Sequence, residues 1–527
     1  MKKLFFIFIV CICVCRTLSA NDTISVRHLH IPVLLNTSEN KIIDIRIKAE
    51  NATKVDKIVL SLDDDCDLQN IQSLALFYSG TVNYGNNRRF FTDPDYAIKL
   101  KEISPVDSRN LTFEPDKTLF PGENHFFVSL CMKPETPLHS RINIKITDVV
   151  VNNQHAYITQ NDPCSYRMGW SLRHGGDDDV AAYRIPGLAT TPKGSLIAVY
   201  DVRYHSPGVD LQEHIDVGMS RSTDKGKTWE PMKIIMDVGE WGGLPQTQNG
   251  IGDPSVLVDE RTGTIWVGAL WTHGMGNGFA WKTSQQGMTP DKTGQMLLVK
   301  SDDDGLTWSK PVNITGMVKQ ESWYLLLFGP GKGITMQDGT LVFPIQYQDS
   351  ARIPSSGIMY SKDRGNTWKI TAPAKSQTTE AQVAEVYPGI LMLNMRDDRG
   401  GSRSVAITKD LGVTWEEHPS SRSALREPVC MASLIKVDAN KNSLKKDILL
   451  FSNPDNTSRR THQTIKMSLD GGLSWEKENQ VMLDELSGAG YSCLTMIDEN
   501  TVGILYEGSA AQMCFQTVRL EDFVENP

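Results

Sequence analysis

The eight residues Ser301-Asp302-Asp303-Asp304-Gly305-Leu306-Thr307-Trp308 are one copy of a pattern that determines the fold. The pattern is Ser/Thr-x-Asp-x-Gly-x-Thr/Ser-Trp, and it begins again at four other positions, Ser222, Ser361, Thr408 and Ser468. An Asp side chain accepts hydrogen bonds from turn amides, Gly tolerates positive φ, and Trp fills space between neighbouring sheets. Each copy is therefore predicted to be a strand-turn-strand unit with a structural and not a catalytic role.

These repeats occupy the larger part of the chain and dictate its architecture. Residues 161–527 accommodate six or seven four-stranded blades at roughly 40 to 60 residues each, and we expect six. Residues 21–160 alternate apolar and polar side chains in runs such as Ile42 to Ile47, Lys57 to Leu62 and Ile142 to Val150, which is the period of β-strands. The prediction is an all-β protein, a six-bladed β-propeller preceded by a smaller β-sandwich domain.

Composition and the N-terminus restrict the location and the partners. The chain has 527 residues and a formal net charge of −9, which argues against nonspecific binding of nucleic acid. Lys2 and Lys3 precede an apolar stretch from Leu4 to Val14, and small residues follow by Ala20, as in a secretory signal peptide over residues 1–20. The stretch is shorter than the ~20 residues that span a membrane. We expect a secreted or periplasmic protein, or one at the cell surface, with no membrane span.

The repeats, together with Tyr183-Arg184-Ile185-Pro186, resemble the Asp boxes and the Arg-Ile-Pro motif of exo-sialidases (neuraminidases). The resemblance covers roughly residues 165–520. It implies a six-bladed β-propeller that acts on terminal α-linked sialic acid. It also implies an arginine triad, a Tyr/Glu pair and an Asp acid/base, with no metal and no cofactor.

Sialic acid bears a carboxylate on its anomeric carbon, and the planar fork of Arg meets a carboxylate with two parallel hydrogen bonds. By resemblance the three arginines are Arg184 of the Arg-Ile-Pro motif, Arg396 in Leu393-Asn394-Met395-Arg396-Asp397-Asp398, and Arg460. Arg460 is preferred to its neighbour Arg459 because it lies eight residues before Ser468 of the last Asp box.

The substrate carboxylate makes an anionic nucleophile unfavourable in a partly desolvated pocket. Sialidases with a tyrosine nucleophile are a known exception to the two-carboxylate scheme of glycosidases, and the resemblance assigns this role to Tyr491. A phenol has a pKa of ~10, so it needs a base within hydrogen-bond reach. Glu380 matches the family position of that base, and Glu385 is its rival. Because five residues separate them, we expect them on opposite faces of one strand.

The leaving oxygen needs a proton, and the resemblance places the Asp acid/base on a loop after the first strand pair. Asp210, in a loop marked by Pro207 and Gly208, is the candidate, and Asp216 is the runner-up. An acid at an open loop tip predicts an acidic pH optimum. The supporting residues that the resemblance implies are Glu507, which would orient the first arginine, and the substrate-binding Arg203 and Asp253. For Asp253, a turn-forming role before Pro254 is an equal alternative. Gln346 and Trp241 are interpreted as wall or core residues.

The function expected from the resemblance is an exo-α-sialidase that removes sialic acid, with retention through a tyrosyl intermediate, from glycoproteins, gangliosides and oligosaccharides. Two alternatives stay open: a trans-sialidase or intramolecular trans-sialidase, and a noncatalytic propeller that binds sialoglycans. The N-terminal region is expected to bind carbohydrate or to act as a spacer. The six cysteines after the signal segment lack CxxC pairs and are expected to be buried free thiols, and we expect a monomer.

Overall fold

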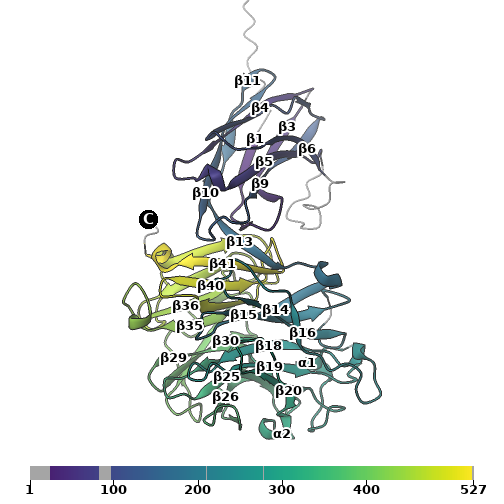
Figure 1. Cartoon of the computed structure of the whole chain (residues 1–527), viewed down its shortest axis with the longest axis vertical. Coiled ribbons are helices and arrows are strands. Elements are labelled where there is room, and N and C mark those ends of the chain that lie inside the picture. Colours follow the sequence, from purple (N-terminus) through teal and green to yellow (C-terminus); the bar gives the residue numbers. More distant parts are fainter. Residues whose placement is uncertain (1–23, 51, 82–96, 209, 277, 525–527) are drawn as a thin grey trace, which may run out of the picture.

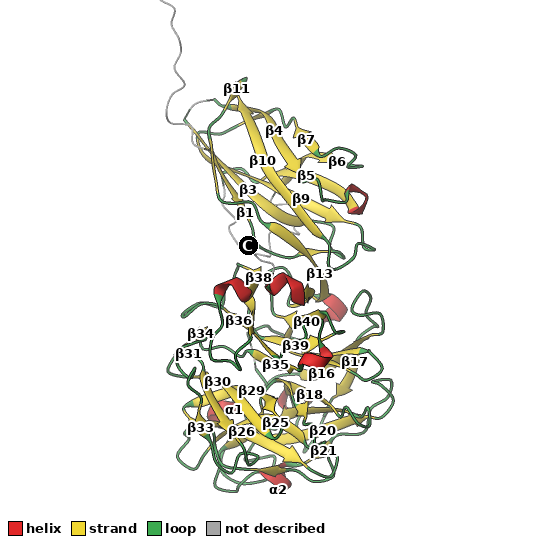
Figure 2. Cartoon of the chain, turned by 90° about the vertical axis from the view of Figure 1, so that its left-hand side faces the viewer, coloured by secondary structure: helices red, strands yellow, loops and turns green. Residues whose placement is uncertain are grey.

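The computed structural model of the chain describes residues 24–50, 52–81, 97–208, 210–276 and 278–524. The predicted signal peptide, residues 1–20, lies outside the described residues. The described chain is all-β, as predicted: strands dominate both regions, and the helices are short (Figure 2). Two of these are single α-turns, α1 (Ala280–Thr283) and α2 (Thr315–Val318), and the others are 3₁₀ turns.

The N-terminal region consists of two sheets that face each other across one apolar core. The first has the strand order β12-β1-β3-β9-β5-β6, and β4 and β10 form the centre of the second. The three strand runs read from the sequence are confirmed as parts of β3, β4 and β10. The bounds in the first sheet are β1 (Ile24–His28), β3 (Asn40–Ala49), β5 (Ile71–Tyr78), β6 (Ile98–Ile103), β9 (Gly122–Met132) and β12 (Ile158–Gln160). Those in the second are β4 (Lys54–Leu62), β7 (Asn110–Phe113), β8 (Lys117–Thr118), β10 (Arg141–Val151) and β11 (Gln154–His155).

The C-terminal region contains five further antiparallel sheets, each with a core of four strands in chain order. The strands of the first sheet are β14 (Ala182–Thr190), β15 (Leu196–Arg203), β16 (Ile215–Ser222) and β17 (Lys233–Met236). Those of the second are β18 (Ile251–Val258), β19 (Ile265–Trp271), β20 (Gln295–Ser301) and β21 (Val312–Asn313), and β23 (Gly331–Lys332) pairs with β18 at its edge. In the third they are β22 (Leu325–Phe328), β25 (Leu341–Gln348), β26 (Pro354–Ser361) and β27 (Lys369–Ile370), with β24 (Ile334–Thr335) and β28 (Lys375–Ser376) at the side.

The fourth sheet contains β29 (Thr378–Tyr387), β30 (Ile390–Asp397), β32 (Ser404–Thr408) and β33 (Glu416–Glu417), and the fifth contains β35 (Ser433–Val437), β36 (Ile448–Pro454), β37 (Gln463–Ser468) and β38 (Gln480–Asp484). A separate ribbon pairs β31 (Gly401–Ser402) with β34 (Arg426–Glu427). A sixth unit consists of β39 (Ser492–Met496), β40 (Thr501–Tyr506), β41 (Met513–Arg519) and β13 (Ser165–Arg173).

The first strands of these six units pack against one another. Strand β14 contacts both β18 and β39, β18 contacts β22, β25 contacts β29, and β35 contacts both β29 and β39. Side chains from distant parts of the chain therefore meet at the ends of these strands.

Strand β13 joins the two regions (Figure 1). It pairs with β41 along one part and with β10 at its start, and the short strand β2 (Val33–Leu34) also pairs with it. Asp522 reinforces the junction by accepting hydrogen bonds from Arg141 and Arg167, at 2.8 and 2.9 Å. The domain boundary between residues 160 and 161 stays a prediction, since one sheet runs across the junction.

The turn chemistry predicted for the repeat is confirmed. Asp303 accepts hydrogen bonds from the amide and the hydroxyl of Thr307, at 2.8 and 2.6 Å, and Ser301 Oγ accepts the N–H of Gly305 at 2.9 Å. Gly305 has a φ of +84°, a value that disfavours any residue with a Cβ. The repeat tryptophans do pack between sheets: Trp229, for example, lies edge-on to Phe515, with ring centroids 5.1 Å apart.

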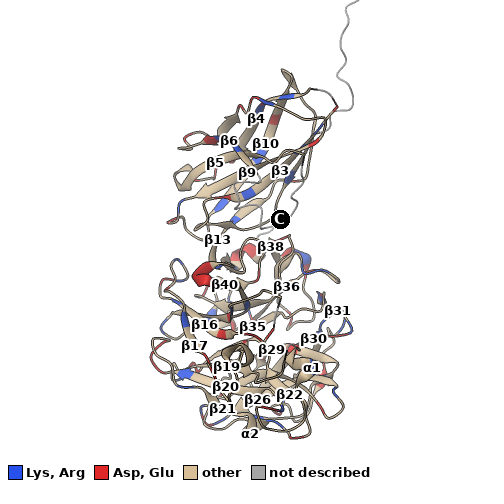
Figure 3. Cartoon of the chain, turned by 90° about the vertical axis from the view of Figure 1, so that its right-hand side faces the viewer, with Lys and Arg blue, Asp and Glu red and all other residues tan. Residues whose placement is uncertain are grey.

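Charged residues of both signs are mixed over both regions on the face shown in Figure 3. All six cysteines of the described residues are free; five are buried as predicted, whereas Cys131 is half-buried. No helix of the described residues has the length and apolar character needed to cross a membrane.

Candidate active site

A cavity of about 540 Å³ opens where the six units converge. Strands β14, β18 and β29 contribute Arg184, Asp253 and Glu380 to its lining. All the site residues expected from the sequence line this cavity except Glu507, which lies behind it. The other expected residues in the lining are Arg203, Asp210, Arg396, Arg460 and Tyr491.

Tyr491 and Glu380 form the centre of the site. The Tyr491 hydroxyl donates a short hydrogen bond to Glu380 Oε1. Arg396 Nη1 donates to both partners, to Glu380 Oε2 at 2.6 Å and to the Tyr491 oxygen at 3.1 Å. Burial, and then the charge of Glu380, raise the pKa of Tyr491 well above its ordinary value. The phenol is therefore neutral at physiological pH, with a carboxylate placed to accept its proton.

Two more arginines flank the Tyr491 ring. The guanidinium carbons of Arg184 and Arg460 each lie 5.5 Å from the ring centroid. Main-chain carbonyls hold Arg460: Nη1 donates to Ala489 O at 2.9 Å and Nη2 to Val429 O at 3.1 Å. Arg459 is exposed and does not line the cavity, so the structure brings Arg460 to the site.

Glu507 lies behind Arg184 and connects it to Tyr491. Its Oε1 accepts from Arg184 Nε at 2.6 Å and from the N–H of Ile185 at 2.9 Å, and its Oε2 accepts from the N–H of Tyr491 at 3.0 Å. Burial raises the pKa of Glu507, but the ion pair with Arg184 and these hydrogen bonds outweigh it, so the pKa lies below its ordinary value. A single buried carboxylate therefore orients both the first arginine and the tyrosine.

On the opposite wall, Arg203 lies between two carboxylates. Its Nη2 donates to Asp201 Oδ2 at 2.8 Å and to Asp210 Oδ1 at 3.4 Å. Asp201 also accepts the N–H of Asp253 at 2.8 Å, and Asp253 has a φ of +54°. Burial and the charges of Asp210 and Asp201 raise the pKa of Asp253 well above its ordinary value. Asp210 itself is half exposed at the open side of the cavity.

Asp216, the rival of Asp210, is buried outside the cavity lining. Its Oδ2 lies 3.5 Å from His214 Nε2. Burial, together with the charge of Asp237, raises the pKa of Asp216 to about 7. The structure therefore brings only Asp210 to the candidate site.

Several residues in or behind the cavity lining were missed from the sequence. Asp201 lies two residues from Arg203 on the same face of β15, so the strand period alone was a signal for it. Thr379 lines the cavity, and its Oγ1 is buried without a hydrogen-bond partner among the described residues. No sequence signal pointed to the apolar part of the wall, which contains Leu211, Leu270, Phe279, Ala280, Trp281, Leu325 and Leu327.

Gln346 lines the cavity, as interpreted, whereas the wall or core role of Trp241 is wrong, because Trp241 lies outside the lining and is 46% exposed. Trp241 packs edge-on against Trp271 and His273, with ring centroids 4.9 and 4.8 Å apart. No group of three or more His, Cys, Asp or Glu side chains suited to a metal ion occurs in the part of the chain that the structure describes.

A second cavity, of about 410 Å³, lies at the other ends of the same first strands. Glu385 of β29 is in its lining, so the two rival glutamates belong to different cavities. Glu385 accepts the N–H groups of Gln337 and Gly389, at 2.7 and 2.8 Å. Glu380 lies near the start of β29 and Glu385 near its end, so the length of the strand places them in different cavities.

Comparison with known proteins agrees with this arrangement. Residues 185–501 match the model of a BNR repeat-like domain, and residues 21–155 match that of the N-terminal domain of BNR-repeat neuraminidase. A sialidase of Bacteroides fragilis (strain YCH46) is 52% identical over 546 residues, which cover all of both chains. A sialidase of Micromonospora viridifaciens is 31% identical over 345 residues, covering 64% of this chain and 51% of that protein.

Among solved structures, the Hadza microbial sialidase Hz136 superposes with a TM-score of 0.91 at 51% identity, covering 95% of this chain and all of that one. The intramolecular trans-sialidase from Ruminococcus gnavus, in complex with oseltamivir carboxylate, has a TM-score of 0.56 at 20% identity and shares the fold. It covers 67% of this chain and 98% of its own.

The all-β fold and the site, with these relatives, define a glycoside hydrolase. Within that class, the chain belongs to the BNR-repeat neuraminidase family, and it is a sialidase.

Proposed function

We propose that this protein is an exo-α-sialidase that releases terminal α-linked sialic acid with retention of configuration, through a covalent intermediate on Tyr491. The observation that carries the proposal is the short hydrogen bond from the Tyr491 hydroxyl to Glu380, with Arg184, Arg396 and Arg460 around the same ring. The substrates we infer are sialylated glycoproteins, gangliosides and oligosaccharides.

The architecture proposed for this enzyme is a closed six-bladed β-propeller, with the six C-terminal units as blades. The contacts from β14 through β18, β25, β29 and β35 to β39 and back to β14 support it. In this arrangement, the N-terminal sheets form a separate β-sandwich over residues 21–160, which binds carbohydrate or acts as a spacer.

Catalysis would begin with binding of the substrate carboxylate by the three guanidinium groups, which supply charge-assisted hydrogen bonds. The proximity of Tyr491 to this clamp would place its oxygen near the anomeric carbon. Glu380 would accept the phenolic proton as the Tyr491 oxygen forms a bond to that carbon. Asp210 would donate a proton to the glycosidic oxygen as its bond to carbon breaks, so that the aglycone leaves as an alcohol.

The second step would reverse these proton transfers. Asp210, now ionised, would take a proton from a water molecule, whose oxygen attacks the anomeric carbon. The bond to Tyr491 breaks, and Glu380 returns the proton to the phenolate oxygen. Two displacements at the same carbon give net retention of configuration.

A fluorogenic α-sialoside, together with NMR of the first-formed anomer, tests this proposal. The wild-type protein should release the aglycone and give the α-anomer first, and Tyr491→Phe should lower kcat by roughly 10³-fold or more. Tyr387→Phe is the matched control, since Tyr387 is an exposed tyrosine of β29 outside this cavity, and it should leave kcat unchanged. First formation of the β-anomer would overturn the covalent mechanism.

Product analysis tests transfer against hydrolysis. Mass spectrometry of products made with and without lactose should show free sialic acid in both cases. A sialylated lactose product would instead indicate a trans-sialidase, and an anhydro sugar an intramolecular trans-sialidase. For location and assembly, we propose a secreted or periplasmic monomer, with attachment to the cell surface as the variant. Fractionation of the producing cells and light scattering of the purified protein test these two points.

A further inference from the structure

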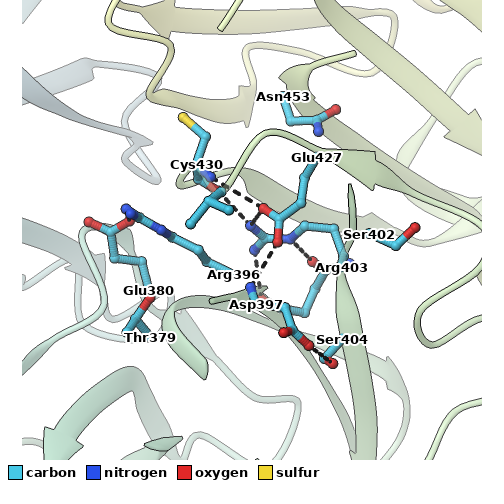
Figure 4. Close-up of polar contacts among 12 residues, drawn as sticks. Thr379, Glu380, Arg396, Asp397, Ser402, Arg403, Ser404, Glu427, Cys430 and Asn453 are labelled. Carbon is cyan, nitrogen blue, oxygen red and sulfur yellow. Dashed lines mark hydrogen bonds and ion pairs between the residues drawn. The ribbon is translucent and has the colours of Figure 1, made fainter. Parts of the chain in front are cut away.

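A buried ion pair lies behind the candidate site and does not line the cavity. Arg403, between β31 and β32, pairs with Glu427 of β34, with 2.8 Å between Nη1 and Oε2. Both side chains have no exposed surface. Figure 4 shows the pair beside Arg396, on the side away from Glu380.

The first target of this pair is the strand that carries Arg396. Arg403 Nε donates to Asn394 Oδ1 at 2.7 Å, and its Nη2 donates to the carbonyl of Asn394 at 3.2 Å. Glu427 Oε1 accepts the N–H of Asp397 at 2.8 Å. Because Asn394 and Asp397 lie on either side of Arg396, the ion pair fixes the backbone at both ends of that segment.

The second target is the turn that holds Arg460. Arg403 Nη1 donates to the carbonyl of Cys430 at 2.7 Å, and Glu427 Oε2 accepts the N–H of Cys430 at 3.4 Å. Val429, the residue before Cys430, has a φ of +54°. This conformation is unfavourable for a β-branched residue and persists only where surrounding contacts impose it. It is the carbonyl of Val429 that accepts from Arg460 Nη2, at 3.1 Å.

We propose that Arg403 and Glu427 are positioning residues that set the spacing of Arg396 and Arg460 in the carboxylate clamp. The pair reaches Arg396 through Asn394 and Asp397, and Arg460 through the strained turn at Val429. The inference rests on the proposed function, in which these two arginines bind the substrate carboxylate.

A positioning role of the ion pair can be distinguished from a contribution to stability, because of what a buried ion pair costs. Taking two charges out of water is costly, and replacing a buried pair by apolar residues of similar size is often neutral or stabilising. Removing one partner, in contrast, leaves an unpaired buried charge. An apolar double substitution therefore removes the hydrogen bonds to Asn394, Asp397 and Cys430 without leaving an unpaired buried charge.

The test compares the Kd values of two ligands that differ in the carboxylate. A change in the folded fraction of the protein does not alter the ratio of these two values. The full-length variant Arg403→Met/Glu427→Leu is titrated by calorimetry with 2-deoxy-2,3-didehydro sialic acid and with its C1 carboxamide. We expect the Kd for the acid to rise by about tenfold and that for the carboxamide by less than about threefold, as expected for one lost charge-assisted hydrogen bond. The wild-type preference for the acid should therefore collapse.

A matched control removes another largely buried ion pair, Arg221 with Asp304, at 2.7 Å, which lies outside the lining of the site. Arg221→Met/Asp304→Leu should leave the ratio of the two Kd values unchanged. Arg396→Met should make the Kd values for the acid and the carboxamide nearly equal. If it does not, the clamp of the proposed function is wrong. If Arg396→Met loses the preference for the acid and the Arg403/Glu427 double variant keeps the wild-type ratio of Kd values, only the positioning role is wrong.

A second variant keeps the proposal testable if the double variant does not fold. Arg403→Lys retains the charge beside Glu427 but has no planar fork to reach Asn394 and Cys430 together. It should weaken binding of the acid about threefold and leave binding of the carboxamide unchanged. An unchanged ratio in a folded Arg403→Lys protein would overturn the proposal.

Discussion

The first strands of the C-terminal units border one cavity at each of their two ends. The two cavities are similar in size, but their charged side chains have different kinds of partners. Both contain charged side chains, and strand β29 contributes a glutamate to each, Glu380 to the larger cavity and Glu385 to the smaller. Glu380 interacts with side chains of other strands, the hydroxyl of Tyr491 and the guanidinium of Arg396. Glu385 accepts backbone N–H groups, and the nearby Arg261 donates to the carbonyl of Gln337 at 2.7 Å.

This difference teaches that charge in a cavity does not identify an active site. At the smaller cavity, Glu385 and Arg261 bind backbone groups, and Lys436 pairs with Asp438 and Asp447, at 3.0 and 2.9 Å. At the larger one, guanidinium, phenol and carboxylate groups from separate sheets are held against each other. Arg184 and Arg396 are each paired with a carboxylate, whereas Arg460 donates to main-chain carbonyls, so the charge of Arg460 favours an anionic ligand at this end.

The strongest test of the comparison exchanges the two glutamates for glutamine. Glu380→Gln should lower kcat by up to roughly 10⁴-fold, because the amide cannot accept the phenolic proton in the way a carboxylate does. Glu385→Gln, on the same strand, should leave kcat and KM unchanged. Steady-state kinetics with a fluorogenic sialoside measures both variants. Equal losses in the two variants would contradict the assignment of the base to one end.

A carboxylate behind the wall of the larger cavity gives the next test. Asp216 has a pKa of about 7 in the folded protein, against about 3.9 in the unfolded chain. The folded state thus binds more protons between these values, so this residue's contribution to stability is greatest below pH 4 and is lost as the pH rises to 7. Asp216→Asn should therefore stabilise the protein by up to about 4 kcal/mol above pH 7 and not at pH 4.

Urea unfolding at pH 4, 6 and 8 measures the difference in stability between Asp216→Asn and the wild type. Kinetic assays of the same preparations decide whether Asp210 or Asp216 is the acid/base. Because Asp216 is outside the cavity lining, Asp216→Asn should keep kcat/KM within about twofold of the wild type. A loss of about 100-fold or more would transfer the acid/base role from Asp210 to Asp216.

The adjacent arginines at the larger cavity provide a third test. Arg460→Met should raise KM by about 10- to 100-fold, because it removes charge-assisted hydrogen bonds to the substrate carboxylate. Arg459→Met changes an exposed residue outside the cavity and should leave KM unchanged. Initial-rate measurements over a range of substrate concentrations distinguish the two. A larger effect at Arg459 would reverse the choice made from the spacing to Ser468.

The sequence predicted those parts of the molecule that depend on local chemistry or on a motif. The Asp-box turn is readable because Ser301, Asp303, Gly305 and Thr307 bond one another within seven residues. Arg184 and Tyr491 were found by resemblance, and the structure brings them to one cavity. Alternation along β29 predicted that Glu380 and Glu385 point to different faces, and the structure places them in different cavities at the two ends of that strand.

The rest could not be predicted because it depends on contacts between distant segments. Glu507 has a partner more than 300 residues away, and only the resemblance suggested it. No period or motif marks Arg403 and Glu427, which bond backbone groups of two segments, at Asn394 to Asp397 and at Cys430. The apolar wall includes Ala280 and Trp281 of α1, and their place at the cavity follows from packing in one cluster with Leu325 and Leu327.

The smallest expected effect lies in the Asp boxes, away from both cavities. Asp303→Ala removes the acceptor for the amide and the hydroxyl of Thr307 and should destabilise the fold by about 1 kcal/mol. It should leave kcat and KM unchanged, because the turn lies outside the lining of either cavity. Thermal unfolding and steady-state kinetics on one preparation measure both quantities. A large loss of activity without a loss of stability would show that the repeats contribute more to the site than its scaffold.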